Sequence, residues 1–278
     1  MCDQGHKLKH LKAHGIRSVG FCVFGLLLIG TVTALALYWH TSQMNWRIAS
    51  SEQSAISQHA DFLKIRFENK SGAHCDVTVV HFNRMYGRVE LVDLPGSPTN
   101  LQSLKKLLDN NDCTTAINGG YFDGSFSPVG LRIFRGAVNA PAISRPPLSG
   151  FISINDKQVI DVTKVQPAAA LYALQTGPFV IDPGGIVGIN PSATSTNRRT
   201  VIAVADNDVF FLITSDLSLF DLANILHDLP GAFGVTKIDR AINLDGGPST
   251  GMAVRLAQTT YCQEPTGPIR EAISLHMN

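Results

Sequence analysis

An apolar run that ends in a carboxylate and two glycines is the first segment of this chain whose residue types could do chemistry. Residues 241–244 have the apolar pattern of a buried strand, Asp245 follows directly, and Gly246 and Gly247 come next. Glycines permit backbone conformations that other residues avoid, so the segment can shape a site around the carboxylate. Asp-Gly is also a common turn dipeptide, and a hairpin turn is the competing structural interpretation.

Three other polar segments lie at the ends of apolar runs: NGGYFDG at residues 118–124, QTGP at 175–178 and NRRT at 197–200. Loops at strand ends, held by a rigid sheet, are where proteins commonly present binding and catalytic groups. We therefore expect the four segments to form one site, which favours a functional role for Asp245 over a simple turn.

The ordered set of these motifs resembles the phosphodiester glycosidase family. The resemblance rests on NGGYFD at 118–123, SPVGL at 127–131, QTGP at 175–178, RRT at 198–200 and NLDGG at 243–247, and it covers roughly residues 75–256. It implies a hydrolase that cleaves a sugar-1-phosphodiester, built on an α+β fold and acting outside the cytoplasm. The chain departs from the family at Pro248, where these proteins often have glycine or another small residue.

Cleavage between an anomeric carbon and a phosphate requires stabilisation of an oxocarbenium-like sugar and of a departing phosphate. Asp245 and Asp123 are the candidate carboxylates that would activate water or attack the sugar. Arg199, or Arg198, is the candidate phosphate clamp because a guanidinium offers bidentate donors. Side chains alternate along a strand, so only one of the two arginines is expected on the site face.

The remaining candidates would bind the substrate. Glycine backbone N–H groups suit phosphate and sugar oxygens, amide and hydroxyl side chains suit sugar hydroxyls, and Tyr121 could stack on a pyranose or belong to the core. The predicted binding residues are Asn118, Gly119, Gly120, Tyr121, Gln175, Thr176, Gly177, Arg198, Asn243, Gly246, Gly247 and Ser249.

No metal or other cofactor is predicted, because neither the cysteines nor the histidines have zinc-ligand spacing. The alternative is a hard cation such as calcium, shared by oxygen atoms of Asn118, Asp123, Asn243 and Asp245.

Composition indicates a folded protein that does not bind nucleic acid. The 278 residues are 44% hydrophobic and 16% charged, which suffices for a sizeable core. The net charge is +1, and basic residues cluster only near the N-terminus, whereas nucleic-acid binding needs a basic face.

The N-terminal segment predicts a single-pass membrane protein. Residues 19–39 contain no Asp, Glu, Lys or Arg and could span a bilayer as a helix. Basic residues precede this run in the segment 1–18, which predicts a cytoplasmic tail and a periplasmic or extracellular domain. A cleaved signal peptide is the alternative, because Ala34-Leu35-Ala36 has suitable spacing. Of the cysteines expected in that oxidising compartment, Cys75 and Cys113 are the predicted disulfide pair.

Residues 40–60 are rich in Ser, Gln and His and predict a linker, followed by one α+β domain over 61–278. Its sheet should be mixed and mostly antiparallel, with helices at 101–110, capped by Thr99 or Asn100, and at 219–229, capped by Ser218 with Asp221. Strands are expected at 62–67, 77–82, 88–94, 114–117, 131–134, 151–154, 159–162, 171–175, 201–204, 209–214, 241–244, 252–256 and 273–276.

The sequence thus predicts a membrane-anchored hydrolase, a glycosidase acting on a carbohydrate phosphodiester such as a GlcNAc-1-phosphodiester in a glycan or glycopolymer. Two alternatives are a non-catalytic module that binds envelope glycans and a structural component of a membrane complex. The second alternative would expose a large apolar patch.

Overall fold

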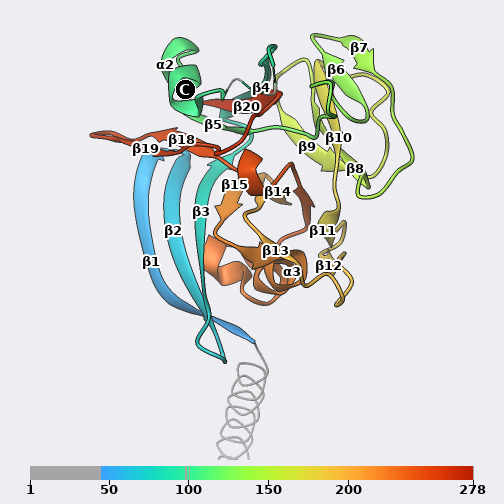
Figure 1. Ribbon diagram of the computed structural model, residues 1–278. Coiled ribbons are helices and arrows are strands. Elements are labelled where there is room, and N and C mark those ends of the chain that lie inside the picture. The colour runs from blue at the N-terminus through green and yellow to red at the C-terminus, as the bar shows by residue number, and fades with distance from the viewer. Residues whose placement is uncertain (1–44, 98, 100, 278) are drawn as a thin grey trace, which may run out of the picture. The chain divides into compact units, whose positions relative to one another are not determined.

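The computed structural model describes residues 45–97, 99 and 101–277 (Figure 1). The predicted cytoplasmic tail and membrane segment lie outside these residues. Within the described part of the chain, no helix has the length and apolar character needed to cross a membrane. Residues Trp46–Asn278 cluster as one compact unit.

The largest sheet has eight strands in the order β1-β2-β3-β15-β14-β17-β11-β12. Every neighbouring pair in it is antiparallel. The strands are β1 (Trp46–Ser57), β2 (Ala60–Asn69), β3 (His74–Asn83), β15 (Asp208–Thr214), β14 (Thr200–Ala205), β17 (Arg240–Asn243), β11 (Phe179–Asp182) and β12 (Ile186–Val187).

Two five-stranded antiparallel sheets and one short strand pair complete the domain. The first five-stranded sheet contains β19 (Thr260–Gln263), β18 (Met252–Arg255), β5 (Thr115–Asn118), β20 (Glu271–Met277) and β4 (Gly87–Asp93). The second contains β7 (Ala137–Ala140), β6 (Arg132–Phe134), β10 (Tyr172–Thr176), β8 (Gly150–Ile154) and β9 (Ile160–Thr163), and β13 (Thr196–Asn197) pairs with β16 (Leu217–Ser218). The predicted mostly antiparallel α+β fold is confirmed.

The central strands of the eight-stranded sheet are buried on both faces, which explains their continuous apolar runs. Along β15, Val209, Phe211 and Ile213 belong to one core, which also contains residues of the two five-stranded sheets. Phe210 and Leu212 point to the opposite core, where they pack with helix α3 (Leu219–Asp228). Side chains alternate between the faces of a strand, so one run of apolar residues serves both cores.

The two helices differ in how well the sequence predicted them. Helix α3 begins where expected, and the Ser218 hydroxyl accepts a 3.0 Å hydrogen bond from the Asp221 backbone N–H. Helix α2 (Leu104–Asn110) begins three residues later than predicted, with Ser103 as its cap in place of Thr99 or Asn100. The Glu264 carboxylate also accepts from the Leu104 backbone N–H at 2.8 Å, a long-range contact that local sequence does not show.

Two further predictions are wrong. Residues 46–60 are not a linker, because they form β1 and the start of β2; β1 is an edge strand with polar residues on both faces, so it lacks the alternation that marks a half-buried strand. Cys75 and Cys113 are both free and lie in different hydrophobic clusters, Cys75 on the α3 side of the sheet and Cys113 beneath α2.

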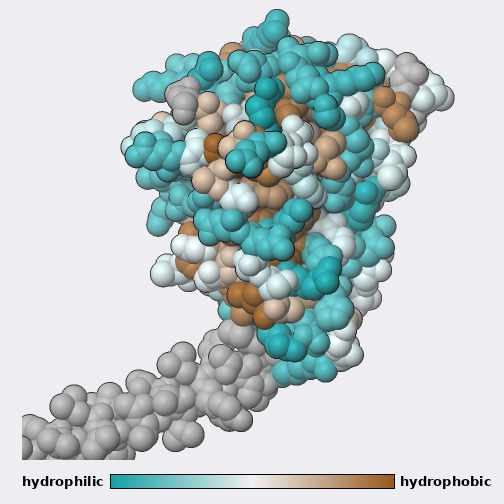
Figure 2. Space-filling model, turned by 90° about the vertical axis from the view of Figure 1, so that its left-hand side faces the viewer, coloured by the Kyte–Doolittle hydropathy of each residue, from teal (hydrophilic) through white to brown (hydrophobic). Residues whose placement is uncertain are grey.

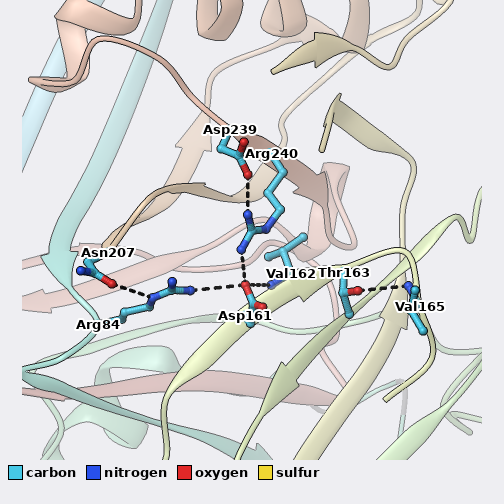
Figure 3. Close-up of polar contacts among 8 residues, drawn as sticks. All are labelled: Arg84, Asp161, Val162, Thr163, Val165, Asn207, Asp239 and Arg240. Carbon is cyan, nitrogen blue, oxygen red and sulfur yellow. Dashed lines mark hydrogen bonds and ion pairs between the residues drawn. The ribbon is translucent and has the colours of Figure 1, made fainter. Parts of the chain in front are cut away.

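A charged cluster joins β9 to the eight-stranded sheet at the end opposite the four strand-end segments (Figure 3). Asp161 on β9 accepts hydrogen bonds from Arg240 on β17 and, at 3.4 Å, from Arg84, which follows β3. Arg240 also pairs with Asp239, and its side chain is only 19% exposed. The cluster therefore ties β9, β17 and the loop after β3 together.

Replacement of Arg240 by methionine should destabilise the domain by about 1–3 kcal/mol, because two carboxylates lose a partly buried partner. The matched control is Arg47→Met, which removes an arginine that is 70% exposed and pairs only with Glu68 at the surface; it should cost less than about 1 kcal/mol. Urea denaturation measures the free energy of unfolding of both variants. Equal losses for the two variants would contradict the clamping role of the Asp161 cluster.

Candidate active site

The side chain of Asn118 joins three of the four segments singled out by the sequence, those at 118–124, 197–200 and 241–251. Asn118 ends β5 and is buried, with its Nδ2 donating to the backbone oxygen of Asp245 at 2.8 Å. Its Oδ1 accepts from the Thr200 hydroxyl at 2.7 Å and from the Gly251 backbone N–H at 3.2 Å. One amide thus holds β5, β14 and the turn after β17 together.

Asn243 makes a second junction beside the first. Its Nδ2 donates to the Tyr121 hydroxyl at 2.9 Å, and that hydroxyl donates to the Gly177 carbonyl at 2.7 Å. The Thr176 hydroxyl donates to the Asn243 backbone oxygen at 2.8 Å. Asn243 Oδ1 is buried and has no hydrogen-bond partner among the described residues, which is uncommon for a buried polar atom.

Asp245 lies half-buried at the end of β17. Its carboxylate accepts from the Gly246 backbone N–H at 2.9 Å and also interacts with the Ser249 side chain. Burial raises the pKa of Asp245 above its ordinary value, although the hydrogen bonds from Ser249 and Gly246 oppose this effect. Such a carboxylate is a stronger base than one in free solution.

Antiparallel pairing of β14 with β17, continued by the 2.8 Å hydrogen bond from the Leu244 N–H to the Thr200 carbonyl, brings the backbone of Arg199 beside that of Asp245. The Tyr121 side chain interacts electrostatically with both residues. The pKa of Tyr121 is raised, first by burial and second by the negative charge of Asp245, while Arg199 acts in the opposite direction. Burial lowers the pKa of Arg199, and Tyr121 and Asp216 partly offset it. The guanidinium is held by its Nε on the Leu217 carbonyl at 3.0 Å and by Nη2 on the Ser195 carbonyl at 2.6 Å.

The two arginines lie between β13 and β14, outside any strand, and their side chains have different partners. Arg198 Nη2 donates to the Thr266 hydroxyl at 2.8 Å and to the Pro248 carbonyl at 3.4 Å. That carbonyl also accepts from the backbone N–H groups of Thr266 and Gly267, both at 2.9 Å. Pro248 occupies the first turn of a short 3-10 helix, Gly247–Ser249, where a proline lacks no needed donor, so the turn accommodates it.

Two of the predicted site residues, Asp123 and Gln175, use their side-chain oxygens in hydrogen bonds within the protein. Asp123 is exposed, and its carboxylate accepts from the Ser125 hydroxyl at 2.6 Å and the Ser127 backbone N–H at 3.0 Å within its own turn. These bonds, led by the Ser125 hydroxyl, lower the pKa of Asp123. Gln175 Oε1 accepts from the backbone N–H groups of Leu131 and Ile143, both at 3.0 Å, and so ties two loops together.

The glycine amides of the site are also engaged. Gly246 N–H donates to Asp245, and Gly247 N–H donates to the Arg198 carbonyl at 2.8 Å. Gly119 N–H donates to the Glu271 carbonyl at 2.9 Å, and the Gly120 backbone hydrogen-bonds to the Glu271 side chain. These glycines shape the loops, and their N–H groups are not free donors for a ligand.

Glu271 and Arg132 form a buried support that sequence reasoning missed. Arg132 Nε donates to Glu271 Oε2 at 2.8 Å, and Arg132 also pairs with Asp93. Burial raises the pKa of Glu271, and the Arg132 charge opposes this. The sequence signal for this pair was a charged residue in each of two mostly apolar segments, Glu271 at the start of 271–275 and Arg132 inside 131–134.

The described residues contain no group of three or more His, Cys, Asp or Glu side chains placed to hold a metal. The alternative calcium site would share oxygen atoms of Asn118 and Asp123. Asn118 Oδ1 already accepts two hydrogen bonds, and the Asp123 carboxylate is bound in its own turn.

A Gly119→Ala substitution should distort the Asn118 loop, because an added Cβ would lie 2.5 Å from the Glu271 Cγ and 3.0 Å from its carbonyl oxygen. We expect a loss of about 1–3 kcal/mol in the free energy of unfolding. Gly124→Ala is the matched control in the same segment, since nothing lies within 4 Å of its added Cβ. Urea denaturation of both variants tests this; a Gly119→Ala protein as stable as the control would refute the tight packing of this loop on Glu271.

Comparison with known proteins agrees with this arrangement. The phosphodiester glycosidase family model matches residues 111–274. No curated protein sequence matches the chain significantly. Similar folds occur in a hypothetical protein from Synechocystis (TM-score 0.62, 16% identity, 82% of this chain and 64% of that one). They also occur in the zebrafish N-acetylglucosamine-1-phosphodiester alpha-N-acetylglucosaminidase catalytic domain auto-inhibited by its pro-peptide (TM-score 0.56, 14% identity, 82% and 88%).

A third similar structure is a putative exported protein from Burkholderia pseudomallei (TM-score 0.57, 10% identity, 83% of this chain and 97% of that one). At identities of 10–16%, the TM-scores of 0.56–0.62 show that these three structures share the fold of this chain. The chain spans about two thirds of the length of the Synechocystis protein, 64%. Because the family model covers more than half of the 278 residues and includes every strand that ends at the site, the chain belongs to the phosphodiester glycosidase family.

Proposed function

We propose that this protein is a hydrolase that cleaves a sugar-1-phosphodiester, such as a GlcNAc-1-phosphodiester, in an extracytoplasmic glycan or glycopolymer. The observation that carries the proposal is the grouping of a half-buried carboxylate, Asp245, with Arg199 and Tyr121 at the end of β17. The similar fold of the zebrafish N-acetylglucosamine-1-phosphodiester alpha-N-acetylglucosaminidase supports the same substrate class.

Asp245 would act on the anomeric centre. An oxocarbenium-like transition state is positively charged, so an ionised carboxylate stabilises it and either activates water or attacks the sugar directly. The raised pKa of Asp245 makes it a stronger base than an exposed aspartate. Asn243 would position the Tyr121 hydroxyl beside it, through the 2.9 Å hydrogen bond from its Nδ2.

Arg199 would bind the departing phosphate. Two of its N–H groups are fixed on the Leu217 and Ser195 carbonyls, which sets the orientation of the guanidinium before substrate arrives. Carbonyl oxygens do not neutralise its positive charge, so the guanidinium remains able to attract phosphate. A phosphate leaves readily, and one carboxylate with one arginine is a sufficient minimal machinery. No metal or other cofactor is part of this scheme.

The location of the domain follows from the sequence. Residues 19–39 would anchor the protein in a membrane with residues 1–18 in the cytoplasm, which leaves the domain periplasmic or extracellular. There it would meet carbohydrate phosphodiesters of the cell envelope or of secreted glycans.

The two predicted carboxylates can be separated by mutation. Asp245→Asn should lower kcat by about 10²–10⁴-fold for release of GlcNAc from a GlcNAc-1-phosphodiester, because the base or nucleophile is lost. Asp123→Asn should stay within about tenfold of the native protein, since the contacts of Asp123 are confined to its own turn. Circular dichroism checks that each variant is folded.

Three results bear on the proposal. Native activity in Asp245→Asn would overturn the role of this carboxylate. A folded native protein that releases no sugar from any of a panel of sugar phosphodiesters would overturn the hydrolase. If that protein still binds the same glycans with an affinity that Asp245→Asn leaves intact, the non-catalytic binding module is the correct function.

The pH profile of kcat/KM should report Asp245 directly. Its pKa lies above the ordinary aspartate value of 3.8 because of burial, and the ionised form is the active one. Activity should therefore fall as the pH drops through this raised pKa and be constant above it. Steady-state kinetics across the acidic pH range measure this fall in activity. If the residual activity of Asp245→Asn falls at the same pH, the ionisation belongs to another group.

A further inference from the structure

A polar cavity of about 420 Å³ lies apart from the Asp245 group, between the strands β2 and β3 and the β18–β19 hairpin. Figure 1 shows this hairpin extending over the upper ends of β1, β2 and β3. The ring of Tyr261 on β19 contacts Phe62 with ring centroids 5.0 Å apart, and its hydroxyl lies 3.3 Å from the Thr78 hydroxyl. The hairpin therefore forms one wall of the cavity and the eight-stranded sheet forms its floor.

The floor consists of two rows of side chains set by strand register. Ser50, Arg66 and Asp76 lie side by side across β1, β2 and β3. Glu52, Lys64 and Thr78 form the next row on the same face, because residues two apart on a strand point the same way. Seen from the β1 side, hydrophilic residues surround smaller hydrophobic areas (Figure 2).

The charges of the cavity are unequally satisfied. Arg66 holds Asp76 with two hydrogen bonds, Nε to Oδ1 at 2.7 Å and Nη2 to Oδ2 at 3.0 Å. Lys64 has no carboxylate within 4.0 Å among the described residues, although Glu52 faces it across the register. Its Nζ lies 5.1 Å from the centre of the Tyr261 ring. Lys64 is thus a cation held at the cavity wall and able to donate to a ligand.

The cavity adjoins the Asp245 group along the sheet. Asp76 exchanges two hydrogen bonds with Ser215, whose backbone N–H donates to the Asp76 carbonyl at 2.9 Å while its hydroxyl accepts from the Asp76 N–H at 3.0 Å. The preceding residue, Thr214, donates from its N–H to the Arg199 carbonyl at 2.9 Å. Adjacent strands are about 4.8 Å apart, so the cavity floor and Arg199 are about 10 Å apart across the sheet.

A second route joins the cavity and the site through the other wall. Gln263 lines the cavity, and Thr266, three residues along, accepts the hydrogen bond of Arg198. Arg198 in turn contacts the Pro248 carbonyl of the turn that follows Asp245. The short segment 263–266 thus reaches from the cavity lining to Arg198.

The lining is suited to carbohydrate. Hydroxyl, amide and charged groups predominate, with one aromatic ring, and the volume falls within the range of about 300–1,000 Å³ typical of small-ligand sites. Acceptors and donors alternate around the floor, which matches the mixed donor and acceptor character of sugar hydroxyls. The floor strands precede residue 111, so this part of the cavity lies outside the region matched by the family model.

We propose that this cavity binds the aglycone side of the substrate, a polyhydroxylated sugar chain beyond the scissile phosphodiester, with Lys64 and Gln263 as its main contacts. The proposal rests on the proposed hydrolase function for its place in the reaction, but binding to the cavity can be measured without turnover. Lys64 would donate to a sugar hydroxyl or to an anionic substituent on the same chain.

The test compares two substrates that differ only in the aglycone. One is the methyl diester of GlcNAc-1-phosphate, and the other joins GlcNAc-1-phosphate to the 6-hydroxyl of maltotriose. Lys64→Met keeps an apolar stem against Tyr261 and removes the charge, and Gln263→Ala removes the amide. Lys157→Met on the β8–β9 turn is the matched control, an exposed lysine outside the cavity.

We expect Lys64→Met and Gln263→Ala to lower kcat/KM for the maltotriose diester about tenfold, mainly through KM, because each loses a hydrogen bond to the bound chain. Both variants should hydrolyse the methyl diester with the kcat/KM of the native protein. Lys157→Met should have native kcat/KM for both substrates. Equal effects on both substrates, or no effect on either, would overturn the aglycone site.

Calorimetric titration with maltotriose 6-phosphate and with maltotriose separates this proposal from the hydrolase function. The cavity site would be supported if the native protein binds these sugars, Lys64→Met weakens the binding and Lys157→Met leaves it unchanged. This holds even if neither diester is cleaved. A loss confined to the phosphorylated sugar would assign Lys64 to an anionic substituent, and a loss with both would assign it to hydroxyls. No binding of either sugar, or binding that Lys64→Met leaves unchanged, would overturn the cavity site.

Discussion

The buried amide of Asn118 is the interaction on which the site depends. It makes three long-range hydrogen bonds, to the Asp245 carbonyl, the Thr200 hydroxyl and the Gly251 N–H, which join β5 to β14 of a different sheet and to the turn at residues 245–251. A buried amide that loses a partner carries a desolvation cost of about 1–3 kcal/mol. The full set of bonds is therefore satisfied in only one arrangement of β5, β14 and the turn, and that arrangement sets the position of Asp245.

The pair of Glu271 and Arg132 supports this arrangement from below. Both side chains are nearly fully buried, and the Glu271 backbone and side chain accept hydrogen bonds from the two glycines that follow Asn118. A buried ion pair contributes little net stability, but breaking it strands a charge in the interior. Its role here is geometric, because the glycines can approach Glu271 closely only without a Cβ.

The same sheet serves two separate purposes at its two ends. The Asp161 cluster joins loops at one end through ion pairs, whereas the opposite end carries the Asp245 group and the polar cavity beside it. Burial of the central strands on both faces gives this scaffold its rigidity, since the apolar side chains of β14 and β15 pack into two cores at once. Rigid strands can hold polar groups at their ends in fixed positions.

Sequence alone determined the features that depend on local pattern. Continuous apolar runs located the central strands, the Ser218 and Asp221 pair located the start of α3, and the ordered motifs identified the family. It narrowed the candidate phosphate clamp to Arg198 or Arg199, and these residues lie between β13 and β14, outside any strand. The sequence did not predict the strand β1, because an edge strand with polar residues on both faces lacks the apolar alternation that marks a half-buried strand.

The contacts across the sequence were decided by tertiary structure. The cap of α2 uses Glu264, which lies 160 positions from Leu104, and the support of the Asn118 loop uses Glu271 and Arg132 from two further strands. Of the two candidate carboxylates, Asp245 lies beside Arg199 where β17 and β14 meet, while the Asp123 carboxylate is bound within its own turn. Local pattern specifies which residues can form a strand or a turn, but burial and long-range partners decide which carboxylate meets which arginine.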